Sequence, residues 1–130
     1  ALPQCRAARG YPPVLSGKMH VLGADQLHGS QERLATDIYP SDFGWTPDWK
    51  KSIPVASTGV NLRSVVEAGT CKRSLQLDFD DDVANKSVQW IYDYGRQSDR
   101  PRPFFHTVSM THPHNPYVTT PPYWDPFKHT

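Results

Sequence analysis

Residues 78–96, DFDDDVANKSVQWIYDYGR, and residues 104–110, FFHTVSM, together decide the predicted fold. The acids that open the first stretch favour a helix N-terminus, because negative charge there complements the helix dipole. Gly95 and Arg96 suit the end of that helix. Apolar or small residues recur between them at spacings of three and four, which predicts a buried helix face made of Val83, Ala84, Ser87, Val88, Ile91 and Tyr94.

Residues 104–110 are rich in strand-forming residues and short enough for a buried strand. Helix, short connection and apolar strand in succession indicate an α/β fold with a mostly parallel sheet. A second strand end is predicted at Val14-Leu15, where Ser16-Gly17-Lys18-Met19-His20 opens into a turn. Residues 4–10 before it are expected to form the last turn of a helix.

The remaining segments show no sustained period. Residues 22–51 contain five glycines and prolines and are expected to form a long irregular loop, a kind of loop that is usually functional. Residues 51–59 are predicted to be a linker or surface loop, and residues 111–130 to be irregular. Two predicted strand ends therefore each deliver a histidine-bearing loop, and ligand sites in open α/β sheets lie at the carboxyl ends of strands.

The composition excludes several classes of protein. A chain of 130 residues with a net charge of +1 and no basic stripe is not expected to bind nucleic acid. No apolar run is long enough to span a membrane, and there is no charged-then-apolar leader. Cys5 and Cys71 could form one disulfide, but two free thiols in a reducing compartment are favoured. The start at Ala1, running straight into an ordered-looking segment, is expected of a piece of a longer protein, although N-terminal processing would also remove a methionine.

Lys18 and His20 alternate after the first strand, so both side chains could point to one side of an extended segment. A lysine beside an imidazole suits an anionic oxyester, because the lysine neutralises oxygen charge and the histidine moves a proton. On spacing alone, a surface lysine and a strand-end histidine without a catalytic role is the better interpretation.

His112 and His114 follow the second strand as His-Pro-His. Zinc needs three or four protein ligands, and the other nearby histidine, His106, lies inside the strand, so a zinc site is not expected. One of the two histidines is predicted to act as an acid or an anion ligand, and the other to be packed or exposed.

Two other features have a functional and a plainer interpretation. Trp45 and Trp49 lie among acids, as in a cage for a quaternary ammonium group, but loop tryptophans also pack onto cores. Cys5, with Arg9 four residues on, imitates an activated thiol. It is rejected as a nucleophile because it lies in the predicted helix turn and nothing activates it.

Several segments, in this order, resemble the choline-sulfatase family of type I sulfatases in the alkaline phosphatase superfamily. They are residues 7–20, ending in G-K-M-H; residues 25–29, 32–34 and 36–40; the loop 41–49, which reads SDFGWTPDW; residues 76–80; and residues 104–117, ending in P-H-N-P-Y. The likeness runs over most of the chain and weakens between Lys50 and Val60.

The resemblance implies that residues 1–130 are part of an α/β sulfatase catalytic domain, without its N-terminal nucleophile and calcium segment and its C-terminal portion. The intact protein would hydrolyse choline O-sulfate in the bacterial cytoplasm, with calcium and a formylglycine from outside this chain. A homo-oligomer is compatible with the family. The matching positions would be catalytic at Lys18, His20 and His114, and would bind the substrate alcohol at Trp45 and Asn61.

Departures from the family pattern are also present. The C-x-P-x-R nucleophile motif and the calcium ligands are missing, Pro12 and Pro13 precede the first strand, and Val60 replaces an expected histidine. Two alternatives stay open: a phosphonate or phosphodiester hydrolase of the same superfamily, and a non-catalytic truncated product. The 130-residue chain alone is expected to be inactive.

Overall fold

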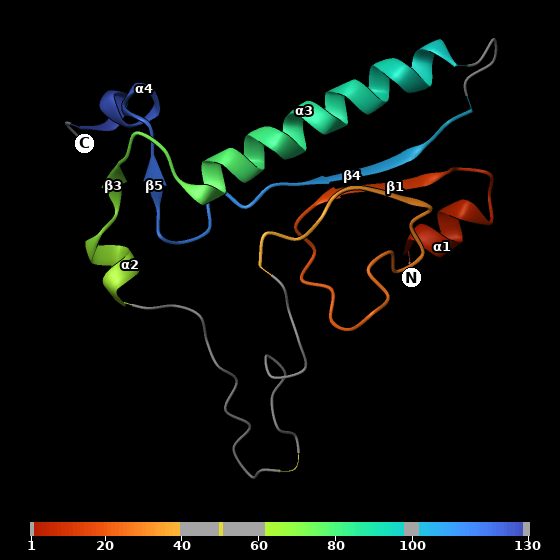
Figure 1. Ribbon diagram of the computed structural model, residues 1–130, viewed down its shortest axis with the longest axis horizontal. Helices are drawn as coiled ribbons and strands as arrows, with labels where there is room; N and C mark the ends of the chain where they lie inside the picture. Colours follow the sequence, from red (N-terminus) through yellow and green to blue (C-terminus); the bar gives the residue numbers. More distant parts are fainter. Residues whose placement is uncertain (1, 40–49, 51–61, 98–101, 129–130) are drawn as a thin grey trace.

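The computed structural model describes residues 2–39, 50, 62–97 and 102–128 (Figure 1). Trp45, Asn61 and Val60 lie outside these residues, as does the predicted linker at 51–59.

A parallel three-stranded sheet lies at the centre of the described chain. Its strands are β1 (Pro13–Gly17), β2 (Glu32–Ala35) and β4 (Phe105–Ser109), in the order β2-β1-β4. All five residues of β1 are buried, as expected for the middle strand of a covered sheet. The predicted α/β class, the parallel sheet and both predicted strands are therefore confirmed.

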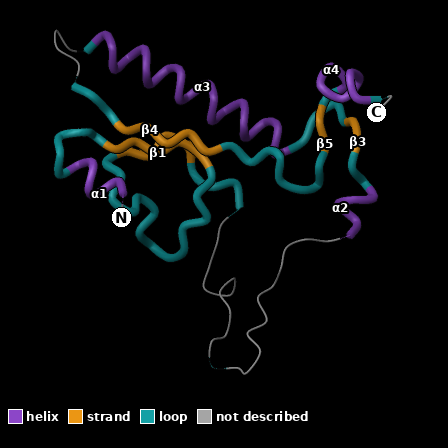
Figure 2. The backbone as a smooth tube through the Cα atoms, turned by 180° about the vertical axis from the view of Figure 1, so that it is seen from behind, coloured by secondary structure: helices purple, strands orange, loops and turns teal. Residues whose placement is uncertain are grey.

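Helix α3 (Leu75–Arg96) lies along one face of this sheet, and the short helix α1 (Leu2–Ala7) lies on the other side, as Figures 1 and 2 show from opposite directions. The predicted helix is confirmed, but it begins before the acids. Ser74 is its N-cap, and the Ser74 side chain accepts a hydrogen bond from the Leu77 amide.

The predicted buried face of α3 is only partly right. Val83 and Ser87 are buried, whereas Val88 and Ile91 are 52% and 46% exposed. The face that packs on the sheet instead repeats at spacings of four and three and includes polar residues: Gln76, Asp80, Val83, Ser87, Trp90 and Tyr94. A search for apolar residues misses Gln76 and Asp80 because they are buried for their hydrogen bonds.

Close packing at the middle of α3 explains why a serine lies there. The Ser87 hydroxyl donates to the Val83 carbonyl at 2.7 Å, and the Ser16 hydroxyl of β1 reaches the same carbonyl at 3.4 Å. Both buried hydroxyl groups therefore find a hydrogen-bond acceptor in the same carbonyl, at the point where the helix meets the strand.

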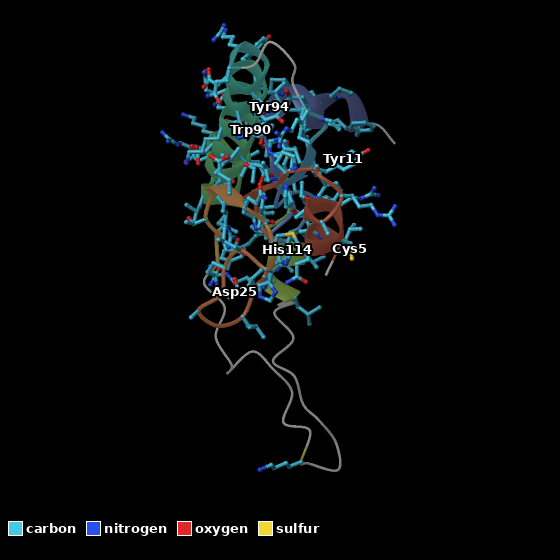
Figure 3. All side chains as sticks on the ribbon, turned by 90° about the vertical axis from the view of Figure 1, so that its right-hand side faces the viewer. Cys5, Tyr11, Asp25, Trp90, Tyr94 and His114 are labelled. Atoms are coloured by element: carbon cyan, nitrogen blue, oxygen red, sulfur yellow. The ribbon has the colours of Figure 1, made fainter. Side chains whose placement is uncertain are left out.

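Trp90 and Tyr94 lie near the C-terminal end of α3 (Figure 3), where the Trp90 ring packs on Phe104 and on His106 of β4. Trp90 stacks on Tyr94 at 4.7 Å between centroids, and it meets the edges of Phe104 and His106 at 5.1 Å each. The Trp90 indole also donates to Glu32 at 2.9 Å. Burial lowers the pKa of the His106 imidazole, and the charge of Glu32 offsets this only partly, so His106 packs here as a neutral ring.

A second, smaller parallel pair of strands, β3 (Gly69–Thr70) and β5 (Val118–Thr119), lies near the first residues of α3 (Figure 1). Helix α2 (Leu62–Val66) precedes β3, and helix α4 (Pro121–Trp124) with a 3₁₀ turn (Asp125–Phe127) follows β5. The prediction of irregular structure for residues 22–51 and 111–130 is therefore wrong where β2, β5 and α4 form. Elements of two to four residues are too short to show a period.

Within the described residues, none of the helices is both long and apolar enough to cross a membrane. Cys5 lies on α1, so the helical structure predicted around it is confirmed, and its side chain is exposed. Cys71 follows β3, and both cysteines are free thiols.

Candidate functional site

The carboxyl ends of β1 and β4 meet at one edge of the sheet, as expected. Gly17 is in register with Ser109, and the Lys18 amide donates to the Ser109 carbonyl at 2.9 Å. The loops that carry Lys18 and His114 therefore begin beside each other.

Gly17 makes this junction possible. Its φ is +100°, and a Cβ added to it would lie 2.0 Å from the Ser109 carbonyl oxygen. Only glycine accepts both the backbone conformation and the close approach of β4. The glycine of G-K-M-H is therefore required by the sheet, independently of any contact with substrate.

Lys18 and His114 both contact the ring of Tyr39. The Lys18 Nζ lies 5.5 Å from the centroid of the Tyr39 ring, within range of a cation–π contact, and the His114 ring centroid lies 6.3 Å from it. Tyr39 follows the third parallel strand, β2, at the same edge of the sheet. Sequence reasoning did not single it out, because β2 was not predicted; its place four residues after a strand end was the available signal.

His20 lies in a different setting from the one its spacing suggested. Strand β1 ends at Gly17, and His20 has a left-handed φ of +51°, so the two side chains do not alternate along an extended segment. His20 lines a shallow depression with Met19, Val21, Leu22, His28 and Pro3.

A buried ion pair fixes the turn that carries Lys18 and His20. Asp37 Oδ2 accepts the backbone amides of Met19 and His20 at 3.0 and 2.8 Å. Arg33 Nη2 lies 3.3 Å from the same oxygen, and both ionic side chains are only 8% exposed. A charge buried this far would be costly without its partner, so the pair holds the turn in place.

Arg33 also binds the rest of the loop. Its guanidinium donates to the carbonyls of Gly17, Gln26 and Ala35 and to the Gln26 side chain, at 2.8–3.2 Å. One planar group thus connects the end of β1, the end of β2 and the loop between them. Sequence reasoning missed Arg33 and Asp37, because nothing in the pattern marks an ordinary Arg and Asp as buried.

His112 and His114 have separate roles in the loop after β4. His112 Nδ1 lies 2.6 Å from Asp80 Oδ2, and His112 Nε2 lies 3.2 Å from the Val118 carbonyl oxygen. Both ring nitrogens are therefore in hydrogen-bond contact with protein oxygens. His114 is exposed, and of its two ring nitrogens only Nδ1 has a described hydrogen-bond partner, the Asn115 carbonyl at 2.9 Å. His112 is therefore held by protein contacts, whereas the His114 ring is exposed.

Asp80 binds the start of this loop from α3. It accepts the backbone amides of Thr111 at 2.5 Å and His112 at 3.0 Å, besides the His112 ring. Burial acts to raise the pKa of Asp80, but these hydrogen bonds and the His112 charge outweigh it, so the pKa is lowered. Asp80 is therefore a carboxylate at neutral pH.

The described residues contain no cluster of three or more His, Cys, Asp or Glu that could hold a metal. The edge formed by Lys18, Tyr39 and His114 can instead bind an anion, through a fixed cation and an imidazole.

No family model matches the chain. A curated choline-sulfatase from Rhizobium meliloti (strain 1021) is 50% identical over 119 residues, which is 89% of this chain and 23% of that protein. The chain thus spans about a quarter of the length of this relative. The resemblance to choline-sulfatase, predicted from the motifs, is therefore confirmed for this segment of the family.

Proposed function

We propose that the intact protein containing this chain hydrolyses choline O-sulfate to choline and sulfate. The observation that carries the proposal is the placement of Lys18 and His114 against the same ring, Tyr39, in a chain 50% identical to a choline-sulfatase. Three parallel strands bring these residues to the edge where α/β folds bind ligands.

Lys18 is assigned to the sulfate group. Its ammonium is a positive charge beside the sheet edge and would neutralise the negative charge of the non-bridging sulfate oxygens. The buried pair Arg33–Asp37 supports this role, because it fixes the turn that follows Lys18.

His114 is assigned to sulfate binding and to protonation of the leaving alcohol oxygen. Its Nδ1 lies 2.9 Å from the Asn115 carbonyl, which can only accept, so Nδ1 carries a hydrogen. Nε2 is then the nitrogen that exchanges a proton with the substrate. His20 is proposed as a second proton-transfer group, on the turn bound by Asp37.

The remaining groups are proposed to come from outside the described residues. Trp45 would pack against the trimethylammonium of choline, and Asn61 would lie near the same group. Residues outside this chain would supply the formylglycine, which would provide the attacking oxygen, and would bind the calcium, which would stabilise negative charge.

The assignment of Lys18 and His114 can be tested on the intact protein by measuring sulfate released from choline O-sulfate. Lys18→Ala and His114→Ala should each lower kcat/KM by about 100-fold or more, because each removes a charge or a proton donor at the reacting group. Lys86→Ala is the matched control, since Lys86 is half-exposed on α3 and pairs only with Asp82 among its described ionic contacts. Turnover of a phosphonate or phosphodiester in place of choline O-sulfate would contradict the proposal.

The alcohol end is tested separately. Trp45→Ala should raise KM for choline O-sulfate far more than for an aryl sulfate, because only choline carries the quaternary ammonium that a tryptophan face attracts. Equal effects on the two substrates would reject this role for Trp45.

A further inference from the structure

We propose that Gln76 is a positioning residue that fixes Tyr39 and His114 relative to each other, an inference that rests on the function proposed above. Gln76 is the second residue of α3 and is 3% exposed. Its Nε2 donates to the Tyr39 hydroxyl at 2.8 Å and to the Asn115 carbonyl at 2.6 Å. The two hydrogens of one amide therefore bind two loops that are far apart in the sequence.

Both loops lead directly to the candidate site. The Tyr39 ring contacts both Lys18 Nζ and the His114 ring. The Asn115 carbonyl, which accepts from Gln76, also accepts from His114 Nδ1. Gln76 is thus connected to His114 through the Asn115 carbonyl that both bind, and to Lys18 through the Tyr39 side chain.

The burial of Gln76 favours a role for its amide over simple packing. Its Oε1 is buried and has no hydrogen-bond partner among the described residues. An unpaired buried carbonyl is unfavourable, and an apolar side chain of similar size would avoid that cost. The amide is explained by its two donated hydrogen bonds, which a leucine could not make.

Gln76→Glu in the intact protein tests this with little change of shape. The Tyr39 hydroxyl can turn and donate to the new carboxylate, but the Asn115 carbonyl cannot donate, so two acceptors would face each other. We expect kcat/KM for choline O-sulfate to fall by about tenfold or more at neutral pH. Acidic pH should restore part of it, because the buried carboxyl, once protonated, donates again.

Three further variants separate positioning from folding. Gln76→Leu should lose a similar factor at every pH, because it has no proton to regain. Tyr39→Phe, which leaves α3 unchanged and removes only one acceptor, should lose a few-fold. Gln89→Glu, on the exposed side of the same helix, should match the wild type.

Binding of inorganic sulfate, followed by the NMR signals of the His114 imidazole, is the readout that does not depend on turnover. We expect Gln76→Glu to weaken this binding about tenfold at neutral pH and less in acid. Wild-type binding by Gln76→Glu and Tyr39→Phe, or a loss in Gln76→Glu without acid recovery, would overturn the inference. If the wild type binds sulfate but does not hydrolyse choline O-sulfate, the proposed function fails and the sulfate data still decide the role of Gln76.

Discussion

At the scale of single residues, Gly17 is a position where the structure leaves no room for a side chain. The Cβ of any other residue would lie 2.0 Å from the Ser109 carbonyl oxygen and 3.1 Å from a Val83 methyl, at a φ of +100°. Neither β4 nor α3 can move away without opening the sheet or the core.

Gly17→Ala should therefore destabilise the protein by about 3 kcal/mol or more, as steric overlap and backbone strain add. Gly10→Ala is the matched control: Gly10 has a φ of +81°, but nothing lies within 4 Å of the added Cβ, so only strain of about 1 kcal/mol is expected. Chemical denaturation of the intact protein measures both. Equal losses in the two variants would show that the contact with β4 does not matter.

At the scale of elements, α3 connects the core to the loop that carries His114. Its sheet-facing side changes character along its length: Gln76 and Asp80 bind backbone groups of the loop after β4, Val83 and Ser87 pack on β1, and Trp90 packs on β4. A helix with this division positions a site at one end and forms a core at the other.

Asp80→Asn should weaken the connection between α3 and the loop after β4. One of the backbone amides of Thr111 and His112 would then face an amide nitrogen, and the His112 ring would lose its carboxylate, so a loss of about 2–4 kcal/mol is expected at pH 7. Asp81→Asn, exposed on the next position of the helix, should change stability by less than about 0.5 kcal/mol. Denaturation midpoints of the two variants measure the difference.

Asp80→Asn should also change how the free energy of unfolding depends on pH. The pKa of Asp80 is lower in the folded chain than in the unfolded one, so the unfolded chain binds its proton first. Its contribution is complete above about pH 4, near the unfolded value, and is lost as pH falls through the lowered folded value. Asp80→Asn should therefore flatten the loss of stability below pH 4. An unchanged acid limb would contradict the assigned hydrogen bonds.

The elements also show what could be predicted from the sequence. The helix predicted over 78–96 and the strand over 104–110 were found because their apolar or strand-forming residues extend over several positions, and the strand end at Val14-Leu15 was found from an apolar pair before a glycine-containing turn. Strand β2 was missed because its sequence, ERLA, begins with two charged residues, Glu32 and Arg33, instead of an apolar run. A four-residue strand is also too short to show a period. That omission hid Tyr39, and with it the contact that joins Lys18 to His114.

The buried polar residues could not be predicted for a different reason. No spacing pattern distinguishes Gln76, Asp80, Arg33 and Asp37 from surface residues. Their hydrogen-bond partners include backbone groups that are far away in the sequence. Their roles depend on the folded geometry alone.

At the scale of the whole molecule, the described chain exposes large apolar side chains on the elements next to the small β3–β5 pair. Leu62 and Val66 of α2 are 82% and 84% exposed, and Tyr123 and Phe127 near α4 are 74% and 69% exposed. Soluble proteins rarely leave such groups uncovered together, and the relative is about four times as long as the matched segment. These surfaces are therefore expected to be covered in the intact protein.

The chain of 130 residues on its own is expected to release no sulfate from choline O-sulfate. Lys18 and His114 can bind and orient an anion, but the attacking oxygen and calcium are proposed to come from other segments, so binding groups alone leave the barrier high. The measurement is sulfate release by the purified chain over many hours, with the intact protein as positive control and a protein-free incubation as the background. Turnover by the isolated chain above that background would show that a nucleophile lies within residues 1–130 and would overturn the proposed division of the site.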